Sequence, residues 1–199
     1  MSKPEEITPD LLLYAYSQGI FPMGNEEDDE IYWYDPNPRA IIPLDTFHIP
    51  RSLARRIRKG GFEVRVDTAF REVITACAEP RADDGLWITP AIIDMYCELQ
   101  RLGYAHSVET WIGGELVGGL YGVALGGLFA GESMFSRAPD SSKIALVHLV
   151  QRLVSGGFVL LDTQFMTEHL RRFGTLEIPR DEYQRRLQIA LEIPADFGT

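Results

Sequence analysis

Residues 105–135 read AHSVETWIGGELVGGLYGVALGGLFAGESMF and contain three runs typical of neighbouring β-strands. The runs cover residues 105–111, 115–125 and 127–135. The first two are joined across Gly113-Gly114, a two-residue connection that favours a tight β-hairpin. This stretch therefore predicts three antiparallel strands at the centre of the fold.

Helical sequence flanks the predicted strands on both sides. Two helices are expected before them, at residues 67–77 and 89–102, and a longer one after them, at residues 140–155. The apolar run 157–165 then fits a buried strand. The order helix, helix, three antiparallel strands, helix, strand is typical of a layered α+β domain of the acyltransferase type. The other elements expected here are a strand at 62–66 and helices at 167–172 and 181–191.

The beginning of the chain predicts shorter elements. Residues 8–19 predict a helix, because Thr8 suits its cap, Pro9 its first turn and Gly19 its end. The proline-punctuated stretch 31–43 predicts short strands joined by turns.

The basic stretch 51–59, RSLARRIRK, predicts a short helix that ends at Gly60-Gly61. After this glycine pair, the short elements and turns give way to the regular strands and helices predicted for residues 62–191. We therefore expect a small N-terminal domain at residues 1–61 and a larger domain at residues 62–199.

The composition restricts the classes of function. A net charge of −10 argues against binding of nucleic acid by the whole surface, although five cations gather at residues 51–59 and five acids at residues 26–30. The histidines and cysteines show no metal-ligand spacing, so we expect no metal and no cofactor. No apolar window reaches the length of a membrane span, and the acidic N-terminal segment has no signal region. We therefore expect no membrane partner and a cytoplasmic location.

The run 157–165, GFVLLDTQF, carries two polar residues, Asp162 and Gln164, at its end. Side chains alternate between the faces of a strand, so these two are expected on one face with Phe158 and Leu160. A buried carboxylate and a buried amide cost desolvation free energy unless they meet hydrogen-bonding partners. From this stretch alone, they are either structural groups such as helix caps or groups that meet a substrate.

Eight stretches carry a family resemblance, in this order: AYSQGIFPM, YWYDPNPRAIIP, HIPRSL, LWITPAI, GYAHSVETW, GELVGGLYGV, LFAGESMFS and LLDTQF. With them the chain closely resembles the leucyl/phenylalanyl-tRNA–protein transferases over nearly its whole length. The resemblance implies a small N-terminal domain followed by a catalytic domain similar to the GCN5-related acetyltransferases. It also implies transfer of Leu, Phe or Met from charged tRNA to the N-terminal amine of proteins that begin with Lys or Arg. Such proteins are thereby marked for N-end-rule degradation.

The implied reaction is the aminolysis of an activated ester, which requires positioning of the amine and removal of its proton. By the resemblance, the amide oxygen of Gln164 accepts a hydrogen bond from the attacking amine, and Asp162 orients Gln164 by holding its amide nitrogen. Glu132, in GESMFS, is suited to an ammonium group, and its alternative role is an ion pair at the end of a strand. Strand alternation predicts Glu132 and Met134 on one face.

The resemblance also implies an apolar pocket for the transferred side chain, formed by Leu120, Met134, Leu146 and Leu149. Taken alone, these four would be core residues. Unbranched Met and Leu side chains suit Leu, Phe or Met better than β-branched donors.

Contacts with the tRNA are implied at two places. Trp87, in LWIT, matches an aromatic residue that stacks on the terminal adenine, and a core position is its alternative. The family commonly has Trp where this chain has Met23, so Trp33 or Tyr34 are candidates for the second wall. The basic helix is expected to meet acceptor-stem phosphates, or else to be a solvated face, through Arg51, Arg55 and Arg58.

Three other functions remain open. An acetyl-CoA-dependent N-acetyltransferase needs a Gly-rich cradle for pyrophosphate before the helix at 140–155, and SRAPDSSKIALVHL has no glycine. A non-catalytic adaptor of the same fold would bind RNA or protein N-termini. A transferase with altered acceptor specificity would, for example, transfer Arg to Asp or Glu N-termini, and the carboxylates of Glu132 and Asp162 disfavour such an anionic acceptor.

Overall fold

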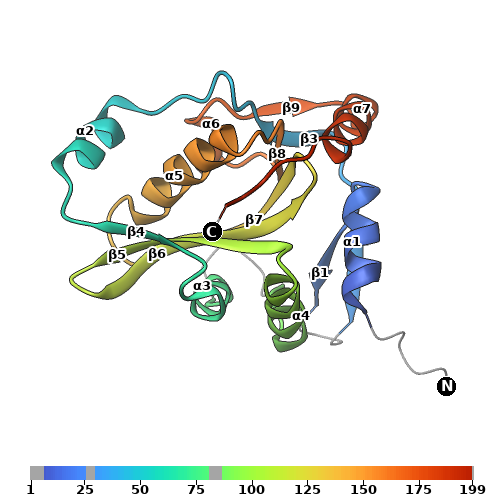
Figure 1. Cartoon of the computed structure of the whole chain (residues 1–199), viewed down its shortest axis with the longest axis horizontal. Helices are drawn as coiled ribbons and strands as arrows, with labels where there is room; N and C mark the ends of the chain where they lie inside the picture. The colour runs from blue at the N-terminus through green and yellow to red at the C-terminus, as the bar shows by residue number, and fades with distance from the viewer. Residues whose placement is uncertain (1–6, 26–29, 81–86, 199) are drawn as a thin grey trace.

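The computed structural model describes residues 7–25, 30–80 and 87–198 (Figure 1). Four of the five acids in the 26–30 run lie outside these residues. Within the described ranges, none of the helices combines the length and the apolar character that crossing a membrane requires.

A seven-stranded sheet forms the centre of the molecule. Its strands, in spatial order, are β4 (Glu63–Val66), β5 (Ala105–Ile112), β6 (Glu115–Leu125), β7 (Leu128–Ser136), β8 (Leu160–Gln164), β3 (Arg39–Ile42) and β9 (Leu176–Ile178). Neighbouring strands pair antiparallel, except that β7 and β8 pair parallel. The three antiparallel strands predicted from residues 105–135 are confirmed, including the hairpin across Gly113-Gly114.

Helices cover both faces of this sheet (Figure 1). The helices α1 (Pro9–Ser17), α3 (Phe70–Cys77) and α4 (Pro90–Arg101) pack on one face, which we call the α4 face. The helices α5 (Ser141–Ser155) and α2 (Arg51–Lys59) pack on the other, the α5 face. The short α6 (Glu168–Arg171) follows β8, and α7 (Arg180–Leu191) packs beside β8 and β3. These layers confirm the predicted α+β class.

The first 61 residues contribute to two sheets. The strands β1 (Phe21–Gly24) and β2 (Ile31–Tyr34) form a separate antiparallel pair. By contrast, β3 lies inside the central sheet between β8 and β9. The boundary at Gly60-Gly61 stays a prediction, and the structure adds that a strand from its N-terminal side helps to build the main sheet.

Threonine caps begin α1 and α4 as the sequence predicts. Thr8 and Thr89 each accept a hydrogen bond from the backbone N–H three residues later, at 3.2 and 3.4 Å. Each threonine side chain thus satisfies one of the backbone donors that the first turn of a helix leaves free.

The helix expected from residue 67 begins later, at Phe70. Asp67 has a φ of 56°, which is outside the right-handed helical region. The backbone N–H groups of Thr68 and Ala69 donate to the buried carboxylate of Glu109, at 2.9 and 2.8 Å. A carboxylate from β5, rather than a local cap, therefore satisfies donors at the start of α3.

Candidate active site

The parallel strands β7 and β8 separate in the middle of the sheet. Their pairing runs from Leu128 and Leu160 to Ala130 and Asp162, where it ends, although β7 continues to Ser136. We call this place the strand fork. Beyond it, the amide Nε2 of Gln164 lies 3.5 Å from Oε1 of Glu132, so side chains bridge the strands where the backbones part.

A β-bulge lies beside each of these two side chains. In β7, Ser133 pairs with Tyr121 and Gly131 with Gly122, so Glu132 is an extra residue in its strand. In β8, Gln164 pairs with Ala40 and Asp162 with Ile41, so Thr163 is the extra residue. A bulge bends a strand locally and changes the direction of nearby side chains. Both bulges therefore change which way the polar groups point at the fork.

The bulge in β7 makes one prediction wrong. Met134 packs against the apolar cluster of the α5 face, whereas Glu132 meets Tyr96 on the α4 face. The two do not share a face, because the extra residue shifts the alternation. Phe135 accordingly belongs to the cluster on the α4 face.

The face predicted for residues 158–164 is confirmed only in part. Leu160 and Asp162 both face Tyr183 of α7. Phe158 instead packs in the cluster of the α5 face, and Gln164 points across the fork toward Glu132. Alternation of side chains therefore predicts the shared face of Leu160 and Asp162 correctly, and it fails at Phe158 and at Gln164.

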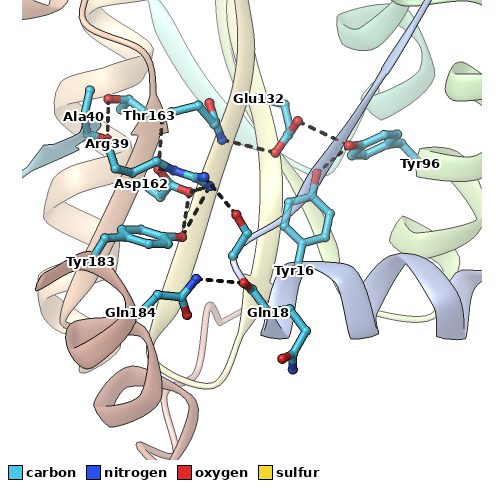
Figure 2. A network of polar contacts seen from close by, with 12 residues as sticks. Tyr16, Gln18, Arg39, Ala40, Tyr96, Glu132, Asp162, Thr163, Tyr183 and Gln184 are labelled. Atoms are coloured by element: carbon cyan, nitrogen blue, oxygen red, sulfur yellow. Dashed lines mark hydrogen bonds and ion pairs between the residues drawn. The ribbon is translucent and has the colours of Figure 1, made fainter. Parts of the chain in front are cut away.

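The carboxylate of Asp162 is fully buried and forms an ion pair with Arg39 of β3 (Figure 2). Arg39 Nε donates to Oδ1 at 2.9 Å and Nη2 to Oδ2 at 2.6 Å. The hydroxyl of Tyr183 donates to Oδ2 at 2.9 Å, and the backbone N–H of Gln164 donates to Oδ1 at 2.9 Å. The predicted contact between Asp162 and the side-chain amide of Gln164 is therefore replaced by a contact to the backbone of the same residue.

Sequence reasoning missed Arg39, although a signal was present. Arg39 is the one charge in the strand RAII, and Asp162 is the one charge in the strand LLDTQ. An unpaired charge inside a protein is very costly, so opposite charges in two buried strands favour a pairing of those strands. That reasoning would have predicted β3 beside β8.

Two tyrosines extend the polar site on the side of Glu132 that faces away from Asp162 and Arg39 (Figure 2). The hydroxyls of Tyr16 and Tyr96 lie 2.5 Å apart, and Tyr96 donates to Oε2 of Glu132 at 3.2 Å. Burial raises the pKa of Glu132 to about 8, against the opposing effect of the tyrosine hydrogen bonds. Burial and the nearby Glu132 also raise the pKa of both tyrosines, so the phenols stay protonated as donors. These tyrosines were also missed, since each lies within ordinary helical sequence.

The four residues predicted to line the pocket are brought together on the α5 face. Leu120 pairs with Met134 between β6 and β7, and α5 contributes the other two leucines to the same cluster. The three leucines are buried and Met134 is partly exposed: Leu120, Leu146, Leu149 and Met134. Its member Met134 follows Glu132 by two residues in the sequence. The cluster lies on the opposite face of the sheet from Tyr96.

Trp87 lies at the edge of the α4 face, just before α4, and is partly buried. Its carbonyl oxygen accepts a hydrogen bond from the backbone N–H of Gly24 at 2.9 Å. A side chain at Gly24 would place its Cβ 2.7 Å from that oxygen, so this approach requires glycine. Met23 is consequently held next to the segment that carries Trp87, and both pack against the same cluster.

The side chains of Trp33 and Tyr34 on β2 are exposed. Tyr34 stacks on Phe21 with 6.0 Å between ring centroids, and Phe21 meets Phe165 edge to face. Phe165 directly follows Gln164 and is exposed. An aromatic surface therefore borders the fork on the side of β1 and β2.

The basic helix α2 forms as predicted, with Leu53 turned into the α5-face cluster. The three arginines predicted to meet tRNA are exposed and make no ion pair with another described residue: Arg51, Arg55 and Arg58. Figure 1 shows α2 at the end of the molecule away from α1.

Metal-binding groups are not assembled in the part of the chain that the structure describes. No cluster of three or more His, Cys, Asp or Glu residues with the geometry to hold an ion occurs there. The polar groups at the fork are instead two carboxyls, an amide, a guanidinium and tyrosine hydroxyls. Such a set can bind an amine and move or hold its proton.

Family models match nearly the whole chain. Residues 41–188 match the model described as leucyl/phenylalanyl-tRNA protein transferase, and residues 5–37 match the model of the N-terminal domain of the same proteins. The larger match includes Ile41 and Ile42 of β3, whereas Arg39 and Ala40 lie between the two matches.

Curated relatives are similar over most of their length. A leucyl/phenylalanyl-tRNA–protein transferase from Herpetosiphon aurantiacus is 59% identical over 194 residues, which cover 97% of this chain and 99% of that one. One from Salinibacter ruber is 54% identical and covers 98% of this chain and 84% of that one. One from Caulobacter vibrioides is 56% identical, with 97% and 90% covered.

Solved structures give more distant similarities. L-PGS from Bacillus licheniformis is 20% identical with a TM-score of 0.44, and covers 81% of this chain and 61% of that one. A ribosomal-protein-alanine N-acetyltransferase from Brucella melitensis biovar Abortus 2308 is 17% identical with a TM-score of 0.38, and covers 70% and 96%.

Proposed function

The chain belongs to the leucyl/phenylalanyl-tRNA–protein transferase family, and we propose that it transfers Leu, Phe or Met to the N-terminal amine of proteins that begin with Lys or Arg. As a member of this family it is an aminoacyltransferase. The transfer would mark its acceptors for N-end-rule degradation and take place in the cytoplasm, where charged tRNA is made.

The observation that carries this proposal is the approach of Gln164 to Glu132 across the strand fork, at 3.5 Å. The amide nitrogen of Gln164 faces Glu132, so its amide oxygen stays free to accept a hydrogen bond from an incoming amine. Backbone groups of β7 beyond Ala130 are released from pairing with β8 at the same place. An amine and an ester can therefore meet in the gap between the strands.

Glu132 would receive the acceptor amine in its ammonium form. Its pKa of about 8 lies near neutral pH, which suits a group that takes up and releases protons there. The carboxylate takes one proton from the ammonium group, and the free amine attacks the ester carbonyl while Gln164 aligns its N–H. The C–N bond forms as the C–O bond to the ribose breaks, and the amine proton passes to the departing ribose oxygen. Positioning and proton removal thus supply the catalysis without a covalent nucleophile.

The apolar cluster on the α5 face would hold the donor side chain. Met134 is one of its partly exposed members and lies two residues from Glu132 in the sequence, which would place a donor side chain beside the reacting ester. A hydrophobic pocket separates substrates that differ by a methylene by only about 1–3 kcal/mol, so donor preference should be graded.

The tRNA would contact two distant parts of the chain. The terminal adenine would stack on Trp87, with Met23 nearby in place of a second aromatic wall, at about 1–3 kcal/mol per stacked base. The exposed arginines of α2 would meet phosphates of the acceptor stem. The position of α2, at the end of the molecule away from α1, leaves its exposed arginines accessible to such a stem.

The test is a matrix of charged tRNAs against peptides with different N-termini, read as transfer of the radiolabelled amino acid. Leu-, Phe- and Met-tRNA should support transfer to Lys and Arg peptides, and Ile-tRNA should not. Gln164→Ala should slow transfer strongly while leaving a measurable residual rate, whereas Gln151→Ala, a matched change at an exposed position of α5, should keep the wild-type rate. Equal use of Ile-tRNA, or a preference for acidic peptides, contradicts the proposal.

A further inference from the structure

Gln164 has an unusual backbone conformation. Its φ is 56°, in the left-handed region that residues other than Gly, Asn and Asp rarely adopt. The N–H of Phe165 donates to the carbonyl of Thr163 at 2.6 Å, so a tight turn centres on Gln164. Such a conformation costs about 1–3 kcal/mol and persists only when its surroundings enforce it.

The side chain of Asp162 is the group that holds this turn. Its Oδ1 accepts the backbone N–H of Gln164 at 2.9 Å. Thr163 adds a weaker contact, from its hydroxyl to the carbonyl of Ala40 at 3.2 Å. The position of the Gln164 side chain thus depends on where the Asp162 carboxylate lies.

Arg39 fixes that carboxylate. Its guanidinium binds both carboxylate oxygens of Asp162 and donates through Nη1 to the carbonyl of Gly19 at 2.8 Å. Its guanidinium carbon also lies over two aromatic rings, 4.9 Å from the centroid of Phe21 and 4.4 Å from that of Tyr183. A planar guanidinium that contacts two rings and donates through all three of its nitrogens is a rigid support.

Four donors occupy the oxygens of Asp162, two from Arg39, one from Tyr183 and one from Gln164. A carboxylate has about four acceptor sites, so Asp162 is saturated. Neither a substrate amine nor a second amide has a place on it. Asp162 is therefore suited to support Gln164 rather than to take part in proton transfer itself.

We propose that Arg39 is a positioning residue, which clamps Asp162 so that the left-handed turn at Gln164 directs the amide side chain across the strand fork. This inference rests on the proposed function and adds a residue, on a different strand, that acts through Gln164. Arg39 also ties Gly19 at the end of α1 to the fork, and α1 carries Tyr16. The contacts of Arg39 thus link β8, which carries Gln164, to α1, which carries Tyr16.

The first experiment combines Arg39→Lys with Gln164→Ala. Arg39→Lys keeps the charge and removes the two-point contact, so single-turnover transfer should fall about 10- to 100-fold, with KM for charged tRNA changed less than about twofold. In the Gln164→Ala background the same change should alter the rate less than about twofold, because the group it positions is gone. Arg65→Lys, at an exposed arginine bound to Glu63, is the matched control and should change nothing. Equal losses in both backgrounds overturn the proposal.

A second variant covers the case in which Arg39→Lys does not fold. Tyr183→Phe removes one donor from Asp162 and leaves the ion pair, so it should give a smaller loss, about two- to fivefold, that also disappears in the Gln164→Ala background. An equal loss in that background, or none in either, counts against the clamp.

Amide hydrogen exchange tests the clamp without any activity. Exchange at the Gln164 amide should accelerate at least about tenfold in Arg39→Lys or Tyr183→Phe relative to buried amides of β6, such as Tyr121. A uniform acceleration, or none at Gln164, overturns the proposal. A wild-type chain that transfers nothing would instead contradict the proposed function, and the exchange result would still decide the role of Arg39.

Discussion

Glu132 and Gln164 lie 3.5 Å apart across the strand fork, although they come from strands whose pairing ends at Ala130 and Asp162. Each lies beside a bulge, Glu132 in β7 and Gln164 next to Thr163 in β8. Two independent interruptions of the ladder therefore aim two polar side chains at one gap. Bulges are frequent at the places where a sheet must present a side chain to a ligand.

The raised pKa of Glu132 predicts a pH-dependent stability. With a pKa of about 8 in the folded chain, against 4.5 as its ordinary value, the folded state keeps a proton that the unfolded chain releases between these limits. The free energy of unfolding should therefore fall as the pH rises from 5 to 8. In Glu132→Gln this contribution is absent, so the variant should gain about 2 kcal/mol relative to wild type between pH 5 and 8.

Urea denaturation at pH 5, 6, 7 and 8 measures this difference. Glu63→Gln, at an exposed carboxylate paired with Arg65, is a control that should follow the wild-type curve without such a gain. Parallel curves for wild type and Glu132→Gln would show that Glu132 is an ordinary ionised carboxylate.

Substitutions at Asp162 and at Gln164 should differ in their effects on the free energy of unfolding and on the transfer rate. Asp162→Asn leaves the buried guanidinium of Arg39 without its counter-charge, so the free energy of unfolding should drop by about 3 kcal/mol and transfer should slow. Gln164→Ala removes a side chain whose hydrogen bond to Glu132 is long, so its stability should change by less than about 1 kcal/mol while transfer slows strongly to a residual rate. Denaturation and single-turnover rates measured on the same preparations test both expectations. Normal transfer by Gln164→Ala would contradict this prediction and would show that Gln164 is a structural residue.

Met134 should influence the choice of donor. Met134→Ala enlarges the apolar cluster beside the fork, so the ratio of kcat/KM for Phe-tRNA over Leu-tRNA should rise about 5- to 50-fold. Val73→Ala opens a comparable space on the α4 face and should leave that ratio unchanged. The two ratios are measured with purified charged tRNAs and one Arg peptide. If both variants shift the ratio alike, general loosening of the core explains it.

Much of the fold follows from sequence patterns that involve only neighbouring residues. The hairpin at Gly113-Gly114, the threonine caps of α1 and α4, and the helices at 51–59 and 140–155 depend on local turn chemistry and periodicity, and all are confirmed. Contacts between distant segments were not predictable in the same way. The three-residue strand β9 has too little sequence to show a pattern and exists because β3 provides its partner.

The site was only partly predictable for the same reason. Asp162, Gln164 and Glu132 stand out as polar residues within apolar strands, and the structure brings them to one place. Their directions depend on bulges, which arise from pairing with strands elsewhere in the chain, so alternation misplaced Glu132 relative to Met134. The missed Arg39 was visible as a lone charge, but its partner is 123 residues away.

The last prediction concerns the basic helix. Changing the three exposed arginines of α2 to alanine should weaken binding of charged tRNA. It should also reduce the magnitude of the slope of log affinity against log salt by about 2–3, since each lost phosphate contact removes about 0.7–0.9. Donor preference should stay the same, because α2 lies away from the fork. The variant carries Arg51→Ala, Arg55→Ala and Arg58→Ala.

A control with the same loss of charge changes three exposed arginines that are already bound to acids: Arg65, Arg71 and Arg101. Filter binding from 50 to 300 mM salt should give the control a slope close to wild type. If both triple variants lose the same slope, the overall charge of the protein governs tRNA binding, and α2 is only a solvated face.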